Sequence, residues 1–175
     1  MPMLVLINGA PGSGKSTLAR LLINERPLAL LLDIDTLRGQ LGQWDADPQA
    51  AGVTARRLAL TMIRTHLAAG LDVVVPQFLF RSGFIVDLEQ AAQESASAFI
   101  KVALVSSPEE SAARFAARED SDDPNHRDAV RLQQSVGAKP IEELYATMLA
   151  MLERERPRTR FVESVVGDID GTFSR

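Results

Sequence analysis

The sequence has 175 residues, of which 46% are hydrophobic and 24% charged, and its formal net charge is −4. These values are ordinary for a globular chain, and we expect a single domain over residues 1–175. The lack of cysteine excludes disulfides, thiolate zinc sites and a cysteine nucleophile. The charge gives no basic surface for duplex nucleic acid, and no apolar run reaches the length of a membrane span.

The first element is the apolar run LVLI at residues 4–7, which predicts a strand buried on both faces. It leads into GAPGSGKST at residues 9–17, which matches the phosphate-loop pattern of glycine, four residues, glycine, lysine and serine or threonine. An apolar stripe from Leu18 to Ile23 predicts a helix that begins near Lys15. A glycine-rich turn without a ligand is the alternative, but the motif lies between a strand and a helix, as phosphate binding requires.

The residue types of this loop suit a bound phosphate. Its glycines permit backbone conformations closed to other residues and let the chain approach a ligand. The amide groups then form a nest for anionic oxygens at the positive end of the helix. Lys15 can reach the β- and γ-phosphates, and the Ser16 hydroxyl can bind Mg²⁺. The expected nucleotide contacts are Gly9, Pro11, Gly12, Ser13, Gly14, Lys15, Ser16 and Thr17.

A second apolar run, residues 28–34, predicts a second strand, and a helix is expected to begin around Asp35. If the strand persists, Asp33 and Asp35 lie on the same side of it. Functional groups of an α/β sheet collect beyond the carboxyl ends of its strands, so Asp35 can accept a proton from a substrate hydroxyl. A helix N-cap is an equally good role for Asp35, and the two roles are compatible. Arg38, one turn later, can bind an anionic substrate group or pair with Asp35.

Residues 39–52 are rich in Gly, Asp and Pro and predict a loop, in which Trp44 either lines a pocket or packs on a helix. Residues 53–69 have helical periodicity, and His66 on that helix has no second ligand at metal-binding spacing, so it is structural or solvated. Gly70 ends this helix.

A third strand, residues 71–76, is followed by Gln77, which is placed to hydrogen-bond a substrate or a metal-bound water. Phe78 and Phe80 either line an apolar pocket or belong to the core. A helix is expected over residues 82–97.

Residues 99–105 predict a fourth strand, after which Ser-Pro-Glu-Glu begins a helix. Arg114 and Arg118 lie on one face of this helix, and Arg127 and Arg131 repeat the spacing beyond a polar segment. Such pairs indicate either a lid that closes on a triphosphate, at about residues 115–139, or solvated helix faces. A helix over residues 141–155 and a fifth strand over 160–162 complete the pattern. Alternating strands and helices predict a three-layer α/β fold with a parallel sheet.

These motifs resemble the small P-loop kinases of the nucleoside monophosphate kinase superfamily, which are AAA-type ATP-binding proteins. The chain is most similar to the group that contains the kinase domain of phage polynucleotide kinase, chloramphenicol phosphotransferase and the zeta toxins. The resemblance extends over essentially the whole chain, and four pieces carry it. These are GAPGSGKST, Asp35 with Arg38, the Ser-Pro-Glu-Glu helix start, and Arg114 with Arg118.

The resemblance implies a P-loop NTPase fold with a five-stranded parallel sheet of order 2-3-1-4-5 and a short helical lid. It implies that Lys15 holds the β- and γ-phosphates of ATP and Ser16 the Mg²⁺. The segment near residues 166–171 would lie by the adenine.

The resemblance further implies that Asp35 is the general base and that Arg38 binds the acceptor. Arg114 or Arg118 would be a lid arginine that neutralises the transferring phosphate. The chain departs from the pattern at the end of the third strand, where many relatives have an acidic residue that helps to hold magnesium and this sequence has Gln77. Metal binding would then depend on Ser16, water, the phosphates and Asp33 or Asp35.

We therefore expect an ATP-dependent kinase that phosphorylates a hydroxyl of a small molecule. Asp35, Arg38 and Gln77 would contact this acceptor, and residues 36–70 would form the substrate side. A polynucleotide or nucleotide 5′-kinase and a non-catalytic ATP-binding switch are the alternatives. Since the first strand begins without a basic leader and cleavage site, we expect a cytoplasmic protein; a monomer is the default for this class.

Overall fold

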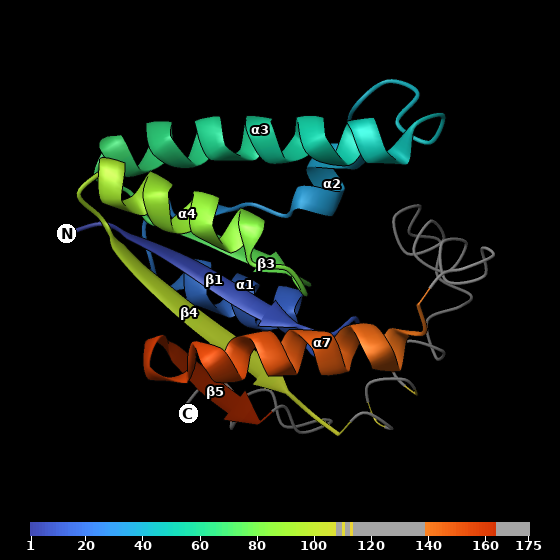
Figure 1. Cartoon of the computed structure of the whole chain (residues 1–175). Helices are drawn as coiled ribbons and strands as arrows, with labels where there is room; N and C mark the ends of the chain where they lie inside the picture. The colour runs from blue at the N-terminus through green and yellow to red at the C-terminus, as the bar shows by residue number, and fades with distance from the viewer. Residues whose placement is uncertain (108–109, 111–112, 114–138, 164–175) are drawn as a thin grey trace.

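The computed structural model of the chain describes residues 1–107, 110, 113 and 139–163. Five parallel strands form one sheet in the order β2-β3-β1-β4-β5, which confirms the predicted topology (Figure 1). The strands are β1 (Met3–Gly9), β2 (Leu30–Leu31), β3 (Val73–Gln77), β4 (Ala98–Val105) and β5 (Thr159–Glu163). The helices are α1 (Lys15–Asn24), α2 (Ile34–Gly39), α3 (Pro48–Ala68), α4 (Gly83–Glu94) and α7 (Ile141–Arg154), and a 3₁₀ turn, η1, spans Arg156–Arg158.

Strand β1 lies at the centre of the sheet and is buried on both faces, as its uninterrupted apolar run predicts. Its register places Asn8 beside Gln77 of β3 on one side and beside Ala103 of β4 on the other. The carboxyl ends of β1 and β3 therefore lie next to each other. The loops that follow these two strands meet at one edge of the sheet, which is where α/β proteins build their sites.

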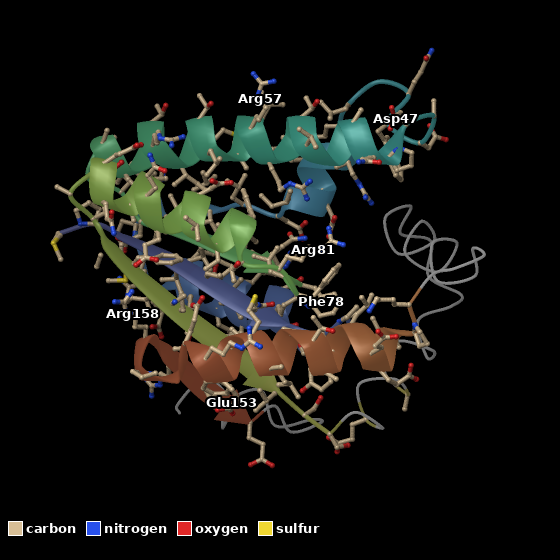
Figure 2. The ribbon with its side chains drawn as sticks, viewed as in Figure 1. Asp47, Arg57, Phe78, Arg81, Glu153 and Arg158 are labelled. Atoms are coloured by element: carbon tan, nitrogen blue, oxygen red, sulfur yellow. The ribbon has the colours of Figure 1, made fainter. Side chains whose placement is uncertain are left out.

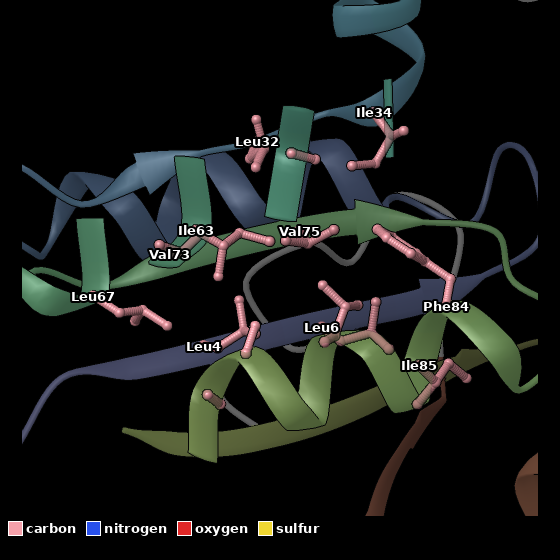
Figure 3. Close-up of a cluster of buried hydrophobic side chains, with 14 of the residues drawn as sticks. Leu4, Leu6, Leu32, Ile34, Ile63, Leu67, Val73, Val75, Phe84 and Ile85 are labelled. Atoms are coloured by element: carbon pink, nitrogen blue, oxygen red, sulfur yellow. The ribbon is translucent and has the colours of Figure 1, made fainter. Parts of the chain in front are cut away.

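Helices cover both faces of the sheet. On one face α3 and α4 pack against Leu4 and Leu6 of β1 and Val73 and Val75 of β3, and Figure 3 shows this cluster. Helix α7 lies on the same face, over β4. On the opposite face α1 packs through Leu18 against residues of β1, β3 and β4. The fold is thus the three-layer α/β arrangement expected from the sequence.

The second strand is much shorter than the expected run of residues 28–34. Leu28 has a positive φ of 59°, so the chain turns there and becomes extended only at Leu30. The strand ends at Leu31, and Asp33 already caps α2, whose first residue is Ile34. The expectation that Asp33 and Asp35 alternate along a continuing strand is therefore wrong, because capping begins the helix first.

The long helix α3 begins at Pro48, five residues before its expected start. The Asp47 carboxylate accepts a hydrogen bond from the Ala50 N–H at 3.0 Å, and Pro48 occupies the first helical turn, where its missing N–H costs nothing. The loop expected over residues 39–52 is accordingly reduced to residues 40–47. At the other end of α3, His66 Nε2 lies 2.8 Å from the Leu28 carbonyl oxygen, in agreement with a structural role.

Helix α7, expected over residues 141–155, buries a tyrosine near its middle. Tyr145 is fully buried, and its hydroxyl donates to the Ser106 carbonyl at 2.7 Å and accepts from the Ser106 N–H at 2.8 Å. It thereby holds the end of β4. The expected lid, apart from Lys139, and the tail near residues 166–171 lie outside the described residues. In the part of the chain that is described, none of the helices has both the length and the apolar character needed to cross a bilayer.

Candidate active site

The phosphate loop connects β1 to α1 and has the backbone geometry that its sequence predicts. Gly12 and Gly14 have φ values of 80° and 88°, in the left-handed region that side-chain-bearing residues rarely adopt. Gly14 is the N-cap of α1, and its carbonyl accepts the Leu18 N–H at 2.9 Å. The loop therefore leads directly into the positive end of a helix, the arrangement that binds anions.

Gly9 is required for a different reason from the other two glycines. It lies in β1 and its φ is not positive, but a Cβ there would lie 2.7 Å from Ser13 Oγ and 3.0 Å from the Leu104 carbonyl oxygen. The tight packing of the loop against β4 thus excludes any side chain at this position. The motif identifies Gly9 correctly, but position 9 needs glycine because of close packing and not because of backbone conformation.

Lys15 lies back across the phosphate loop. Its Nζ donates a hydrogen bond to the Ala10 carbonyl oxygen at 2.7 Å. Its charge also acts on the carboxyl of Asp35, so the loop and the end of β2 share one electrostatic environment. An ammonium group in this place can neutralise charge on the phosphates of a nucleotide and also interact with the group that attacks them.

The residues near the start of α1 suit a magnesium ion. Ser16 and Asp33 line the same cavity of about 490 Å³, between α1 and the segment that joins β2 to α2. A hydroxyl and a carboxylate are the hard oxygen ligands that Mg²⁺ prefers, alone or through water. No cluster of three His, Cys, Asp or Glu side chains at metal-binding distance is found among the described residues.

Asp33, and not Asp35, is the N-cap of α2. Its Oδ1 accepts hydrogen bonds from the N–H groups of Asp35 and Thr36 at 2.9 and 3.0 Å. The capping role that the sequence offered for Asp35 is thus filled by its neighbour. Because Asp33 caps the helix, the Asp35 carboxylate is available for chemistry just beyond the carboxyl end of β2.

The Asp35 carboxylate is held by two side chains and remains accessible. Gln77 Nε2 donates to its Oδ2 at 3.3 Å, and Arg38 Nη2 lies 4.0 Å from its Oδ1. Half of the side-chain surface, 50%, stays open to solvent, whereas Arg38 is only 14% exposed. Burial by the surrounding protein raises the pKa of Asp35 above its ordinary value, and the positive charge of Arg38 partly opposes that shift. A carboxylate with a raised pKa is a stronger proton acceptor than an ordinary aspartate.

Arg38 is fixed from its other side by Trp44. Its guanidinium lies 4.8 Å from the centroid of the indole ring, a cation–π contact. Trp44 therefore packs on helix α2 through Arg38, which is one of the two placements that the sequence allowed. The sequence is compatible with two roles for Arg38, binding of an anionic group and pairing with Asp35, and its position near Asp35 fits both.

Gln77 is the last residue of β3, and its side chain has a second polar atom besides the one that bonds to Asp35. Its Oε1 is buried and has no hydrogen-bond partner among the described residues. A buried acceptor left unsatisfied beside a carboxylate is unusual in folded proteins and is a feature of ligand sites. The structure thus brings Asp35, Arg38 and Gln77 together, as the sequence suggested.

Asn8 is a functional residue that the sequence reasoning missed. It is buried at the end of β1, where its Nδ2 donates to the Leu79 carbonyl and its Oδ1 accepts the Leu79 N–H, each at 2.9 Å. These two bonds fix the segment that follows Gln77. The signal was present in the sequence, because a polar residue directly after the apolar run of a buried strand needs a partner.

Arg114 and Arg118 lie outside the described residues, so their place at the site stays a prediction. A helix start that precedes them in the sequence is described in part. Ser107 and Glu110 form a reciprocal capping box, in which the Glu110 N–H donates to Ser107 Oγ at 3.1 Å and the Ser107 N–H donates to Glu110 Oε2 at 3.2 Å. The predicted helix start after β4 is therefore confirmed.

Comparisons with known proteins agree with this geometry. Residues 4–140 match the family model described as an AAA domain. A gluconokinase from Sinorhizobium meliloti 1021 is 20% identical and has a TM-score of 0.60, covering 99% of this chain and 88% of its own. A chain of the Pnkp1/Rnl/Hen1 RNA repair complex is 18% identical with a TM-score of 0.69, covering 87% of this chain and 46% of its own. The PezAT toxin–antitoxin system of Streptococcus pneumoniae contributes a chain 14% identical with a TM-score of 0.66, covering 93% and 68%.

These likenesses to solved structures establish a shared fold. No curated protein matches the sequence significantly.

Proposed function

The chain belongs to the AAA domain family, and we propose that it is an ATP-dependent phosphotransferase that moves the γ-phosphate of ATP to a hydroxyl of a small-molecule acceptor. The observation that carries this proposal is the Asp35 carboxylate, which is half open to solvent and within electrostatic reach of Lys15 on the phosphate loop. A carboxylate in this position can take the proton of an attacking hydroxyl.

On the nucleotide side, the proposed work is positioning and charge neutralisation, because phosphoryl transfer needs little covalent chemistry from the protein. The backbone of residues 9–17 would cradle the phosphates, and Lys15 would exchange the Ala10 carbonyl for phosphate oxygens. Ser16 would hold the Mg²⁺, with Asp33 reaching it through water. When bound, this ion would offset the negative charge of the β- and γ-phosphates.

On the acceptor side, Asp35 would act as the general base. The proton of the acceptor hydroxyl passes to Asp35 as the acceptor oxygen bonds to the γ-phosphorus. The bond between that phosphorus and the oxygen that bridges to the β-phosphate breaks, and ADP leaves with that oxygen. Gln77 would keep the carboxylate oriented through its 3.3 Å hydrogen bond, and Arg38 would hold an anionic part of the reacting groups.

A lid arginine would complete the neutralisation of charge on the transferring phosphate. Arg114 and Arg118 are the candidates, because they are spaced four residues apart in the sequence, beyond the helix start at Ser107 and Glu110. In this proposal one of them reaches the γ-phosphate when the segment at about residues 115–139 closes.

The test is transfer of labelled γ-phosphate from ATP–Mg²⁺ into a panel of hydroxyl compounds, with binding of the nucleotide measured in parallel. We expect Asp35→Asn to lower turnover by about 10²- to 10⁴-fold while nucleotide affinity stays nearly unchanged. Asp45→Asn is a matched control, because it removes the same charge from an exposed loop residue. Lys15→Ala is the blank and should abolish transfer.

Two outcomes would contradict the proposal. Unchanged transfer by Asp35→Asn would remove Asp35 from the role of base. Binding of ATP–Mg²⁺ without transfer to any acceptor of a broad panel would favour the nucleotide-dependent switch instead.

A further inference from the structure

A cavity opens beside Gln77, the hydrogen-bond partner of Asp35. It has a volume of about 500 Å³ and lies between α3, the segment that follows β3, and the first turns of α4. Gln77, which donates to Asp35, is one of its lining residues. We call it the acceptor cavity, because Gln77 joins it to the Asp35 carboxylate.

The acceptor cavity concentrates positive charge. Arg56 and Arg57 from α3 and Arg81 from the segment after β3 all line it. Among the described residues Asp87 is the one acidic side chain that does so. This imbalance stands out because the whole chain has a formal net charge of −4. A cavity with three guanidinium groups and one carboxylate favours an anionic ligand.

Among the described residues some surface arginines have an acidic partner, whereas the arginines of the cavity, like Arg20, Arg154 and Arg160, have none. Arg26, Arg64 and Arg158 each form an ion pair, with Asp72 at 2.9 Å, Glu94 at 2.7 Å and Glu89 at 3.9 Å. By contrast, over the part of the chain that the structure describes, Arg56, Arg57 and Arg81 make no ion pair, not even with the neighbouring Asp87. Their donors are thus available to a ligand.

The three arginines are not equivalent. Arg57 projects from the outer side of α3, and it also borders a separate cavity with Arg64 (Figure 2). Arg81 lies beyond the end of β3, near Phe78 (Figure 2), and its guanidinium is 5.6 Å from the ring centroid of Phe80. The inference therefore rests chiefly on Arg56 and Arg81.

The remaining walls of the cavity are largely apolar. The rings of Phe78 and Phe80 lie 5.7 Å apart, centroid to centroid, and are half-buried. Asn8 fixes the segment that carries them through its two hydrogen bonds to Leu79. Aromatic walls with a few charged groups are typical of small-molecule sites.

We propose that the acceptor is a small hydroxyl compound that carries an anionic group, a phosphate or a carboxylate, which Arg56 and Arg81 bind while its hydroxyl lies at Asp35. This inference rests on the proposed phosphotransferase function and adds the substrate class to it. Guanidinium groups bind both anions through paired N–H donors. The aromatic walls would contact the apolar part of the same compound, and the transfer to its hydroxyl balances as described above.

The test compares acceptors in pairs that share a scaffold, with an anionic group in one member and a neutral group in the other, and kcat/KM is counted per acceptor hydroxyl. Suitable probes are 1,4-benzenedimethanol against 4-(hydroxymethyl)benzoate, and neutral sugars and nucleosides against their acid or phosphate forms, with labelled ATP–Mg²⁺ as donor. We expect kcat/KM to be at least about tenfold higher for the anionic member of a pair, since a hydrogen-bonded charge contributes at this scale. The carboxylate and phosphate members show which anion is preferred.

Variants of the cavity separate recognition from a structural role. Arg56→Gln and Arg81→Gln should each lower kcat/KM for the anionic acceptor by about 10- to 100-fold, and should leave the neutral acceptor and the nucleotide dissociation constant unchanged. Arg160→Gln is the matched control, because it removes the same charge from an exposed residue of β5 at the far edge of the sheet. Loss of structure alone would lower kcat/KM equally for both acceptors.

The outcomes separate this inference from the function on which it rests. Transfer to neutral and anionic members with equal efficiency would overturn the inference and leave the phosphotransferase standing. Transfer to a 5′-hydroxyl oligonucleotide alone would also overturn it, because the acceptor would be a polymer. Nucleotide binding without transfer to any compound would overturn the phosphotransferase itself.

Discussion

The proposed nucleotide side of the site is built from consecutive residues of one loop, whereas the proposed acceptor side draws on side chains from several separate elements. Residues 9–17 supply the phosphate loop through backbone conformation, with left-handed φ values at Gly12 and Gly14. The acceptor side combines Asp35 and Arg38 of α2 with Gln77 of β3 and the arginines of the acceptor cavity. The first region can therefore be recognised from a short motif, and the second requires the fold.

The two regions also differ in what a substitution would do. In the phosphate loop, a side chain added to the backbone disturbs the geometry of the whole nest. On the acceptor side, a single change alters one contact and leaves the other elements in place. Substitutions that separate nucleotide binding from acceptor use would therefore sharpen this comparison. After Asp35→Asn, the largest effect is expected where the two regions meet.

Asp33 lies at that junction, since it caps α2 and shares a cavity with Ser16. Asp33→Asn keeps a good cap but removes the charge that would hold Mg²⁺ through water. We expect the Mg²⁺ concentration for half-maximal turnover to rise by about 10- to 100-fold, as for other groups that hold a metal indirectly. Thermal unfolding should change little.

Asp33→Ala provides the matched comparison. It removes the cap as well, and we expect it to cost about 0.5–2 kcal/mol of stability in addition to the same change in Mg²⁺ requirement. If Asp33→Asn needs no more Mg²⁺ than the wild type, Asp33 acts only as a cap.

Two neighbouring residues of β1 offer the next test, because Asn8 supports the acceptor side and Gly9 the nucleotide side. Asn8→Ala leaves the Leu79 N–H and carbonyl without their partners, and Gly9→Ala places a Cβ against Leu104 and Ser13. Each change should cost about 1–3 kcal/mol of folding free energy. For a chain of this size every 1 kcal/mol lowers Tm by about 2–4 °C.

The two variants should differ in their kinetics despite similar losses of stability. Asn8→Ala is expected to raise the acceptor KM, and Gly9→Ala to raise the nucleotide dissociation constant. Gly42→Ala is a control for adding a methyl group, since no atom lies within 4 Å of its Cβ position. If both variants weaken both ligands equally, the two regions are not separate in the way described here.

Several parts of the fold and site could be predicted from the sequence because they depend on local patterns. The phosphate loop, the strand order implied by the family resemblance and the approach of Asp35, Arg38 and Gln77 are confirmed. The true cap of α2 was missed because alternation along a strand was extended past the point where Asp33 begins the helix. Hydrogen-bonding requirements, more than periodicity, decide such ends.

Contacts between distant segments were the part that the sequence could not supply. Asn8 bonds to Leu79, seventy-one positions away, and Tyr145 bonds to Ser106 across thirty-nine. A polar group in an apolar run shows that a partner is needed but not which one. The cavity arginines were missed for the same reason, since Arg56 and Arg81 become neighbours only when α3 packs over the end of β3.

The smallest expected effect concerns the pH dependence of turnover. Burial raises the pKa of Asp35 above its ordinary value, while the charge of Arg38 lowers it. A general base must be ionised, so kcat/KM should fall as the pH falls through this raised pKa, above the ordinary aspartate value of about 3.9. Arg38→Gln should move this fall of kcat/KM, the acid limb of the pH profile, to higher pH. Asp35→Asn should abolish the acid limb, and the control Arg160→Gln should leave it unchanged.

The free energy of unfolding should also depend on the ionisation of Asp35, and the raised pKa of this residue decides the direction of the dependence. Because the pKa of Asp35 is raised in the fold, the folded chain favours the protonated carboxyl, and the stability it contributes is lost as the pH rises through that pKa. Asp35→Asn, which is never charged, should therefore be more stable than the wild type at neutral pH although it is far less active. A variant that loses activity and stability together would show instead that Asp35 is held by contacts that favour its ionised form, and the acid limb would then lie below the ordinary value.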